Sequence, residues 1–166
     1  CEQLAIGDCL AVAALNKKGF SRKNFKVLHP KGSLGAQLKT VEDLMIKGNK
    51  IPFINQKLNM KKALSLITKK KLGVLIAIDN KKFTTGIITD GQIRRSSQKN
   101  KSLIDLTVKK VMTKNPLSVD KDMLAVKGLA IMSENKITSL CVHKKKSPKR
   151  TIGVLHIHNI LDGNIS

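Results

Sequence analysis

The chain has few aromatic residues, few cysteines and no long apolar run. Its 166 residues include no Trp, no Tyr and four Phe, which disfavours a protein that stacks nucleobases on aromatic side chains. Cys1, Cys9 and Cys141 have neither a metal-binding spacing nor the even number of a disulfide framework, so we expect reduced thiols in the cytoplasm. The longest apolar stretch, residues 72–78, is too short to cross a bilayer. We therefore expect a cytoplasmic protein without a membrane partner.

Acidic residues are also scarce. There are 11 of them against 32 basic residues, which gives a formal net charge of +21. Only four of the basic residues are Arg, whereas sites that read bases favour the Arg fork. Because the lysines are spread along the whole chain, we interpret them as a solvated surface and consider nucleic acid an unlikely partner. A basic patch that attracts phosphorylated ligands stays open. A nucleic-acid binder would instead bind DNA in a strongly salt-dependent way.

The chain contains one pattern twice, over residues 41–93 and 108–160. In each copy, apolar residues at helical spacing precede an apolar run and then a step that begins with Gly. The helical positions are Met60, Ala63, Leu64 and Ile67, echoed at a constant offset by Ala125, Gly128, Leu129 and Met132. The apolar runs are residues 73–77 and 138–142, and the steps are residues 86–89 and 153–156. Because a repeat of this length cannot close its own core, we expect the two copies to pack together.

Each copy is predicted to follow the order β-α-β-β-α. The expected strands are residues 51–54, 74–78 and 85–89 in the first copy, and 117–119, 139–143 and 152–156 in the second. The expected helices are residues 60–70, 90–98, 123–134 and 158–161, with Asn59 and Asp122 as helix caps. Helices on one face of a small sheet give an α+β architecture.

The doubled unit, with its Gly-x-x-Thr or Gly-x-x-His step before the last helix, resembles a tandem pair of CBS domains. The implied domains are residues 41–100 and 108–164. Upstream, residues 5–11 and the His-Pro-Lys-Gly-Ser-Leu-Gly segment at 29–35 are similar to the end of a sugar isomerase (SIS) domain. Residues 1–38 are therefore expected to be the carboxy-terminal remnant of an α/β SIS domain. The whole order resembles the carboxy-terminal half of bacterial D-arabinose 5-phosphate isomerases.

That resemblance implies an enzyme that interconverts D-ribulose 5-phosphate and D-arabinose 5-phosphate for synthesis of the lipopolysaccharide sugar Kdo. It needs no cofactor, and the complete protein is expected to be a homotetramer. The reaction needs a base to move a proton between adjacent carbons, and the family places His29 in the active site. Lys31 stands where the family usually has Gly. The other active-site groups of the family lie upstream of Cys1, so we expect this chain alone to be inactive.

Two other interpretations stay open. The chain could be a stand-alone CBS ligand sensor in which residues 1–40 are only a docking helix. It could also belong to a related isomerase that serves a capsule or sugar-alcohol pathway. A sugar isomerase domain encoded upstream of Cys1 would favour an enzyme, and a native start codon near Cys1 would favour the sensor.

CBS pairs often bind adenosine-type nucleotides through a Gly-x-x-Thr-x-x-Asp signature, with Thr near phosphate and Asp on the ribose. The resemblance implies Thr89, Asp90 and Gln92 as ligand contacts in the first copy, and His156 and Asn159 in the second. Gln and Asn can bind a diol, but without the charge-assisted bond that Asp provides. A nucleotide or nucleotide sugar is therefore one expectation, and a structural pair that assembles the oligomer is the other.

His156 and His158 would share one face if this segment were a strand, which is a workable geometry for a metal ion. No third Cys, His or carboxylate is placed to complete the ligand set, and the segment lies where a strand is expected to turn into a helix. We therefore predict no metal site.

Overall fold

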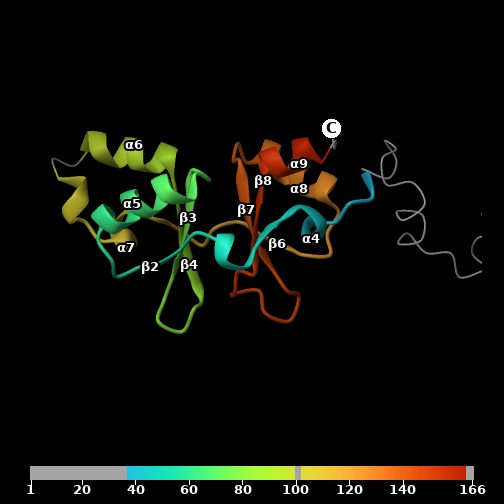
Figure 1. Cartoon of the computed structure of the whole chain (residues 1–166), viewed down its shortest axis with the longest axis horizontal. Coiled ribbons are helices and arrows are strands. Elements are labelled where there is room, and N and C mark those ends of the chain that lie inside the picture. The colour runs from blue at the N-terminus through green and yellow to red at the C-terminus, as the bar shows by residue number, and fades with distance from the viewer. Residues whose placement is uncertain (1–36, 100–101, 164–166) are drawn as a thin grey trace, which may run out of the picture.

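The predicted order of elements is present in both copies of the repeat (Figure 1). The computed structural model describes residues 37–99 and 102–163. The first repeat contains β2 (Phe53–Asn55), α5 (Met60–Lys70), β3 (Val74–Ile78), β4 (Thr84–Thr89) and α6 (Asp90–Lys99). The second contains β6 (Ser118–Asp120), α8 (Ala125–Glu134), β7 (Ser139–His143), β8 (Gly153–His156) and α9 (Ile157–Asp162). In each, the first strand pairs parallel with the second, and the second pairs antiparallel with the third.

Each repeat completes the sheet of the other, which the sequence did not reveal. Ahead of the first repeat lie α4 (Val41–Leu44), β1 (Ile46–Lys47) and the 3-10 turn η1 (Gly48–Lys50). Ahead of the second lie the 3-10 turn η2 (Leu103–Asp105), α7 (Val108–Val111) and β5 (Thr113–Lys114). Strand β1 pairs with β8, and β5 pairs with β4, so the four-stranded sheets have the orders β1-β8-β7-β6 and β2-β3-β4-β5. An ion pair of 2.6 Å between Glu42 and Lys121 also links α4 to the second repeat.

Because successive side chains of the central strands point to opposite faces of the sheets, the buried apolar residues form three clusters. On β3, Leu75 and Ala77 face α5, whereas Val74 and Ile76 face the other sheet. There they pack with Ile51 and with Cys141 and Val154 of the second repeat. The helices thus cover the outer faces of two sheets whose inner faces meet (Figure 1). This arrangement confirms that the two copies pack together.

The start of α5 is capped as predicted, but the start of α8 is not. The Asn59 side chain accepts a hydrogen bond of 3.2 Å from the Lys62 N–H. Helix α8 begins at Ala125 rather than at residue 123, and its N-cap is Leu124, which offers no side-chain acceptor. The predicted cap Asp122 instead lies in a turn, where its backbone N–H donates to the Asp120 carboxylate. The prediction of Asp122 as the cap of this helix was wrong, because Asp120 and Asp122 belong to a turn that ends before the helix begins.

We expect Asn59→Ala to lower the free energy of unfolding by about 1 kcal/mol, because Ala cannot accept the Lys62 N–H at the start of α5. Chemical denaturation measures this change. Asp122→Ala is the matched control and should stay within about 0.5 kcal/mol of the unaltered chain, since Asp122 caps no helix and makes only an exposed ion pair. Equal losses in the two variants would contradict the assignment of the caps.

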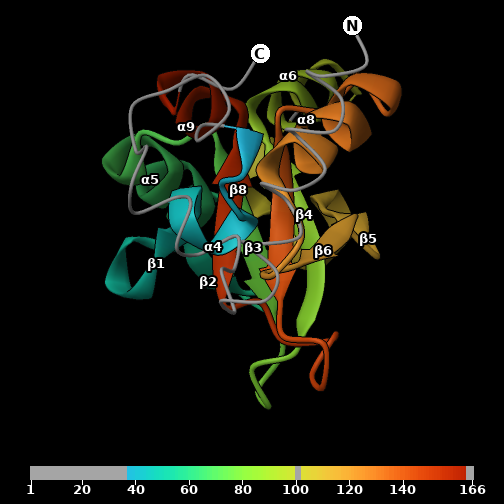
Figure 2. The same cartoon turned by 90° about the vertical axis from the view of Figure 1, so that its right-hand side faces the viewer.

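The two hairpin loops, residues 79–83 and 144–152, extend from the same end of the molecule (Figure 2). The Arg150 guanidinium of the second loop lies 5.0 Å from the ring centre of Phe83 in the first. At the start of β4, the Thr84 hydroxyl makes a 2.7 Å hydrogen bond with the Thr151 hydroxyl of the second loop. The lysine run at 144–146 lies in the second loop. The starts of α6 and α9 lie at the opposite end. Within the described parts of the chain, no helix has the length and apolar character needed to span a membrane.

Candidate functional site

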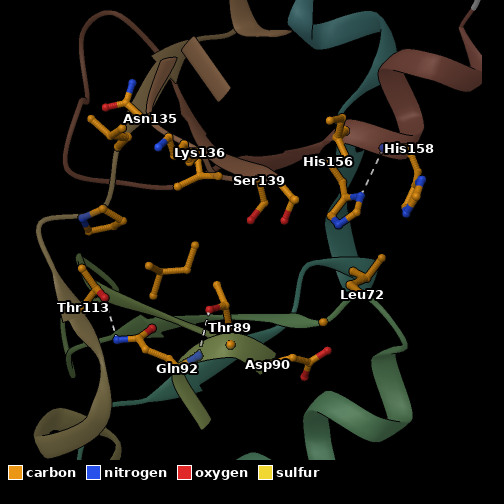
Figure 3. Close-up of a pocket in the computed structure, with 18 of the residues that line it drawn as sticks. Leu72, Thr89, Asp90, Gln92, Thr113, Asn135, Lys136, Ser139, His156 and His158 are labelled. Carbon is orange, nitrogen blue, oxygen red and sulfur yellow. Dashed lines mark hydrogen bonds between the residues drawn. The ribbon is translucent and has the colours of Figure 1, made fainter. Parts of the chain in front are cut away.

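A cleft of about 1040 Å³ opens between the two repeats, at the end away from the hairpin loops. Both repeats line it, with the side chains of Thr89 on one wall facing those of Ser139 and His156 on the other (Figure 3). Every ligand contact expected from the CBS signature lies at this cleft: Thr89, Asp90, Gln92, His156 and Asn159.

The first wall is formed where β4 passes into α6. The Thr89 hydroxyl accepts the Gln92 N–H at 3.4 Å. The Gln92 amide nitrogen donates to the Val111 carbonyl at 3.0 Å and to the Thr113 hydroxyl at 2.6 Å, so it is turned toward the β5 segment (Figure 3). Both amide hydrogens of Gln92 therefore have partners within the protein, which leaves its carbonyl oxygen as the group for a ligand.

The Asp90 carboxylate lies against Gly73 at the start of β3. Gly73 has a φ of +64°, and a Cβ atom there would lie 2.9 Å from Asp90 Oδ2. The Asp90 N–H also donates to the Gly73 carbonyl at 3.1 Å. Glycine suits this position, because its φ is left-handed and because a side chain here would displace the Asp90 carboxylate.

The second wall is formed where β8 passes into α9. His156 pairs with Ser139 in the β7–β8 ladder, and its Nδ1 accepts the His158 N–H at 3.3 Å. The two imidazole rings are stacked, with 5.0 Å between their centres and 28° between their planes. Burial lowers the pKa of His156, and the nearby His158 lowers it further. The strand ends at His156, so the two histidines do not share a strand face.

The structure adds charged residues to the site that sequence reasoning did not select. Lys71, Arg95 and Lys136 line the cleft, where Asp90 is the one carboxylate among the described lining residues. Lys71 and Lys136 have φ angles of 56° and 52° and follow α5 and α8 at equivalent points of the two repeats. A left-handed angle is uncommon for a residue other than Gly. Aligning the two repeats would have matched these lysines, but no motif marked them.

The predictions for His29 and for the SIS-like segment cannot be followed into the structure, because residues up to 36 lie outside the described residues. For a metal ion, residues 37–99 and 102–163 contain no group of three or more His, Cys, Asp or Glu side chains placed to hold one.

The CBS domain model matches residues 41–99 and 108–164, the two halves that form this cleft. The chain belongs to the CBS domain family. Its fold, a tandem CBS pair of the α+β class, is as predicted, and the solved CBS pairs below share it. Over 163 residues this chain is 36% identical to "Arabinose 5-phosphate isomerase KdsD" of Salmonella typhi. The aligned region covers 98% of this chain and 49% of that protein. The chain spans about half the length of the curated relatives it matches.

Solved CBS pairs superpose on this chain. One is the CBS domain pair of protein MJ0100 in complex with 5′-methylthioadenosine and S-adenosyl-L-methionine, with a TM-score of 0.67, 21% identity, and coverage of 75% of this chain and 94% of that one. Another is CBSX2 in complex with AMP, with a TM-score of 0.65, 24% identity, and coverage of 75% and 95%. At these identities the likeness shows the fold.

Proposed function

We propose that this chain is the CBS-containing half of an arabinose 5-phosphate isomerase. The complete enzyme would interconvert D-ribulose 5-phosphate and D-arabinose 5-phosphate in the cytoplasm for Kdo and lipopolysaccharide synthesis, as a homotetramer. The observation that carries the proposal is the 36% identity over 98% of the chain to a relative of that name. The aligned region, 163 of the 166 residues, includes the segment upstream of the CBS pair that contains His29, which we propose as the catalytic residue.

In this proposal the CBS pair regulates the enzyme by binding a small anionic ligand, a nucleotide or nucleotide sugar, in the cleft. The cleft carries three lysine or arginine side chains and one carboxylate, together with hydroxyl, amide and imidazole groups. Such a lining suits a phosphorylated ligand. The complexes of the two related CBS pairs with AMP, S-adenosyl-L-methionine and 5′-methylthioadenosine support a ligand of nucleotide size.

An isomerase assay on the complete gene product, run beside the 166-residue chain, tests the proposed enzyme. We expect the complete protein to convert D-ribulose 5-phosphate to D-arabinose 5-phosphate, and the 166-residue chain to show no turnover above a blank preparation. A complete protein that is folded and oligomeric yet inactive on this pair would overturn the isomerase assignment.

A stand-alone ligand sensor is the second candidate function. It is favoured by one observation: both walls of the cleft come from this chain, so the ligand site needs no other domain. A panel of adenosine nucleotides and nucleotide sugars, titrated by calorimetry into the complete protein and read together with the isomerase assay, separates the two functions. Binding by a complete protein that lacks isomerase activity would favour the sensor.

A further inference from the structure

The two walls of the cleft differ in what they offer to a ligand. On the first wall, the Gln92 amide is held by Val111 and Thr113, and the Asp90 carboxylate lies among the cations Lys71 and Arg95. On the second wall, two imidazole rings are stacked, and Lys136 and Ser139 also line the cleft (Figure 3). Among the described lining residues, only those of the second wall include imidazole side chains beside a lysine.

We propose that the stacked pair His156 and His158, with Lys136 on the same wall, is a proton-linked anion site for the phosphoryl group of the ligand. This inference rests on the ligand-binding role proposed for the cleft, and it assigns the anionic end of the ligand to the second repeat. Binding draws a proton onto the histidine pair, so that affinity rises as pH falls.

The hydrogen bond within the pair indicates the protonation state of His156 in the empty cleft. Nδ1 of His156 accepts the His158 N–H at 3.3 Å, so Nδ1 carries no proton in this structure. A proton on Nδ1 cannot coexist with the hydrogen bond from the His158 N–H, so protonation opens that bond and converts Nδ1 into a charged donor. An anion in the cleft can accept from that donor, which offsets the burial and the neighbouring His158 that disfavour the charge in the empty cleft.

Groups from the other elements around the cleft point to the same class of ligand. Lys136 follows α8, Lys71 follows α5, and Arg95 projects from α6, whereas β7 contributes the uncharged Ser139. The opposing carboxylate is Asp90, on the other wall. The surrounding charge favours an anion and disfavours a cation.

The direction of the pH dependence follows from the pKa of His156. In the empty cleft, burial and the neighbouring His158 hold this pKa below the usual range of a histidine, and a bound anion raises it. Between these two pKa values, binding is accompanied by uptake of up to one proton by His156. The affinity then rises by up to about tenfold for each unit that the pH falls. Well above the pKa of the complex, binding takes up no proton and affinity is independent of pH.

Sulfate is a suitable probe, because its charge stays constant from pH 5 to pH 8.5 while that of a phosphate monoester changes. We would follow the imidazole Cε1–H signals of the 166-residue chain by NMR across this range, with and without sulfate, and assign them with single His→Gln variants. We expect sulfate to raise the pKa of His156, and to leave that of His143 unchanged. His143 is the internal control because it lies in β7 beside Ser118, away from the cleft.

An unchanged pKa of His156 at saturating sulfate, or an equal rise for His143, would overturn the inference. In a second measurement, sulfate affinity is expected to lose its pH dependence in His156→Gln and to keep it in His143→Gln. AMP binding at pH 8 tests the proposed ligand role separately. AMP binding without any sulfate-linked change at His156 would overturn this inference alone, whereas failure to bind any member of the nucleotide panel would overturn the ligand role itself.

Discussion

His29→Ala in the complete protein is expected to lower kcat for the interconversion of D-ribulose 5-phosphate and D-arabinose 5-phosphate by about 10²- to 10⁴-fold, the usual contribution of a positioned acid or base. The reaction moves a proton between adjacent carbons, and an imidazole can both accept and return that proton near neutral pH. His29 is the histidine of the SIS-like segment, so we propose it for this role. Initial rates measured with saturating sugar phosphate give kcat directly.

His143→Ala is the matched control for His29→Ala, because it removes a histidine whose one described side-chain contact is Ser118. This variant should retain kcat within about threefold. Circular dichroism and the oligomeric mass of both variants need to match those of the unaltered protein, so that a fall in rate is not a folding defect. A folded His29→Ala protein that retains more than a tenth of the activity would remove His29 from the proposed chemistry.

The repeat was the part of the fold that the sequence predicted best, because residues at equivalent positions of the two copies pack in equivalent surroundings. Three of the four helical positions matched between the copies are buried in both, and the fourth, Leu64 and Leu129, is half-buried in both. The buried ones are Met60, Ala63, Ile67, Ala125, Gly128 and Met132. The two-residue strands β1 and β5 were missed because neither is long enough to alternate, and because each pairs with the opposite repeat. A pairing between distant segments leaves no local pattern.

The candidate site, like the fold, could be predicted from the sequence only in part. The position of Thr89 follows from the Gly-x-x-Thr step, which places it where a strand meets a helix at the cleft. The bond between Gln92 and Thr113 depends on the exchange of β5 and could not be predicted from either segment alone. The cleft lysines Lys71 and Lys136 follow helices at positions where Gly is usual, so sequence patterns gave no reason to select them.

Gly86→Val is expected to lower the free energy of unfolding by about 3 kcal/mol, at the upper end of the cost of overpacking. A Cβ atom at Gly86 would lie 2.5 Å from Met112 Sδ and 2.8 Å from the Thr113 carbonyl oxygen. Met112 can move aside, but the Thr113 carbonyl belongs to β5, which pairs with β4 at this point. Accommodating Val therefore requires β5 to shift away from the sheet. Urea denaturation followed by circular dichroism measures the loss.

Gly91→Ala is the control for Gly86→Val, since the nearest atom to a Cβ at Gly91 is the end of the Arg95 side chain at 3.5 Å, an ordinary contact. That variant should be neutral or slightly stabilising, because Ala is preferred to Gly within a helix. A loss below about 1 kcal/mol for Gly86→Val would show that β5 is not held tightly.

Because β1 and β5 each belong to the sheet of the other repeat, we also expect Gly86→Val to move the unfolding of both repeats together, as one transition. Two separate transitions, with only the first repeat shifted, would contradict the exchanged strands.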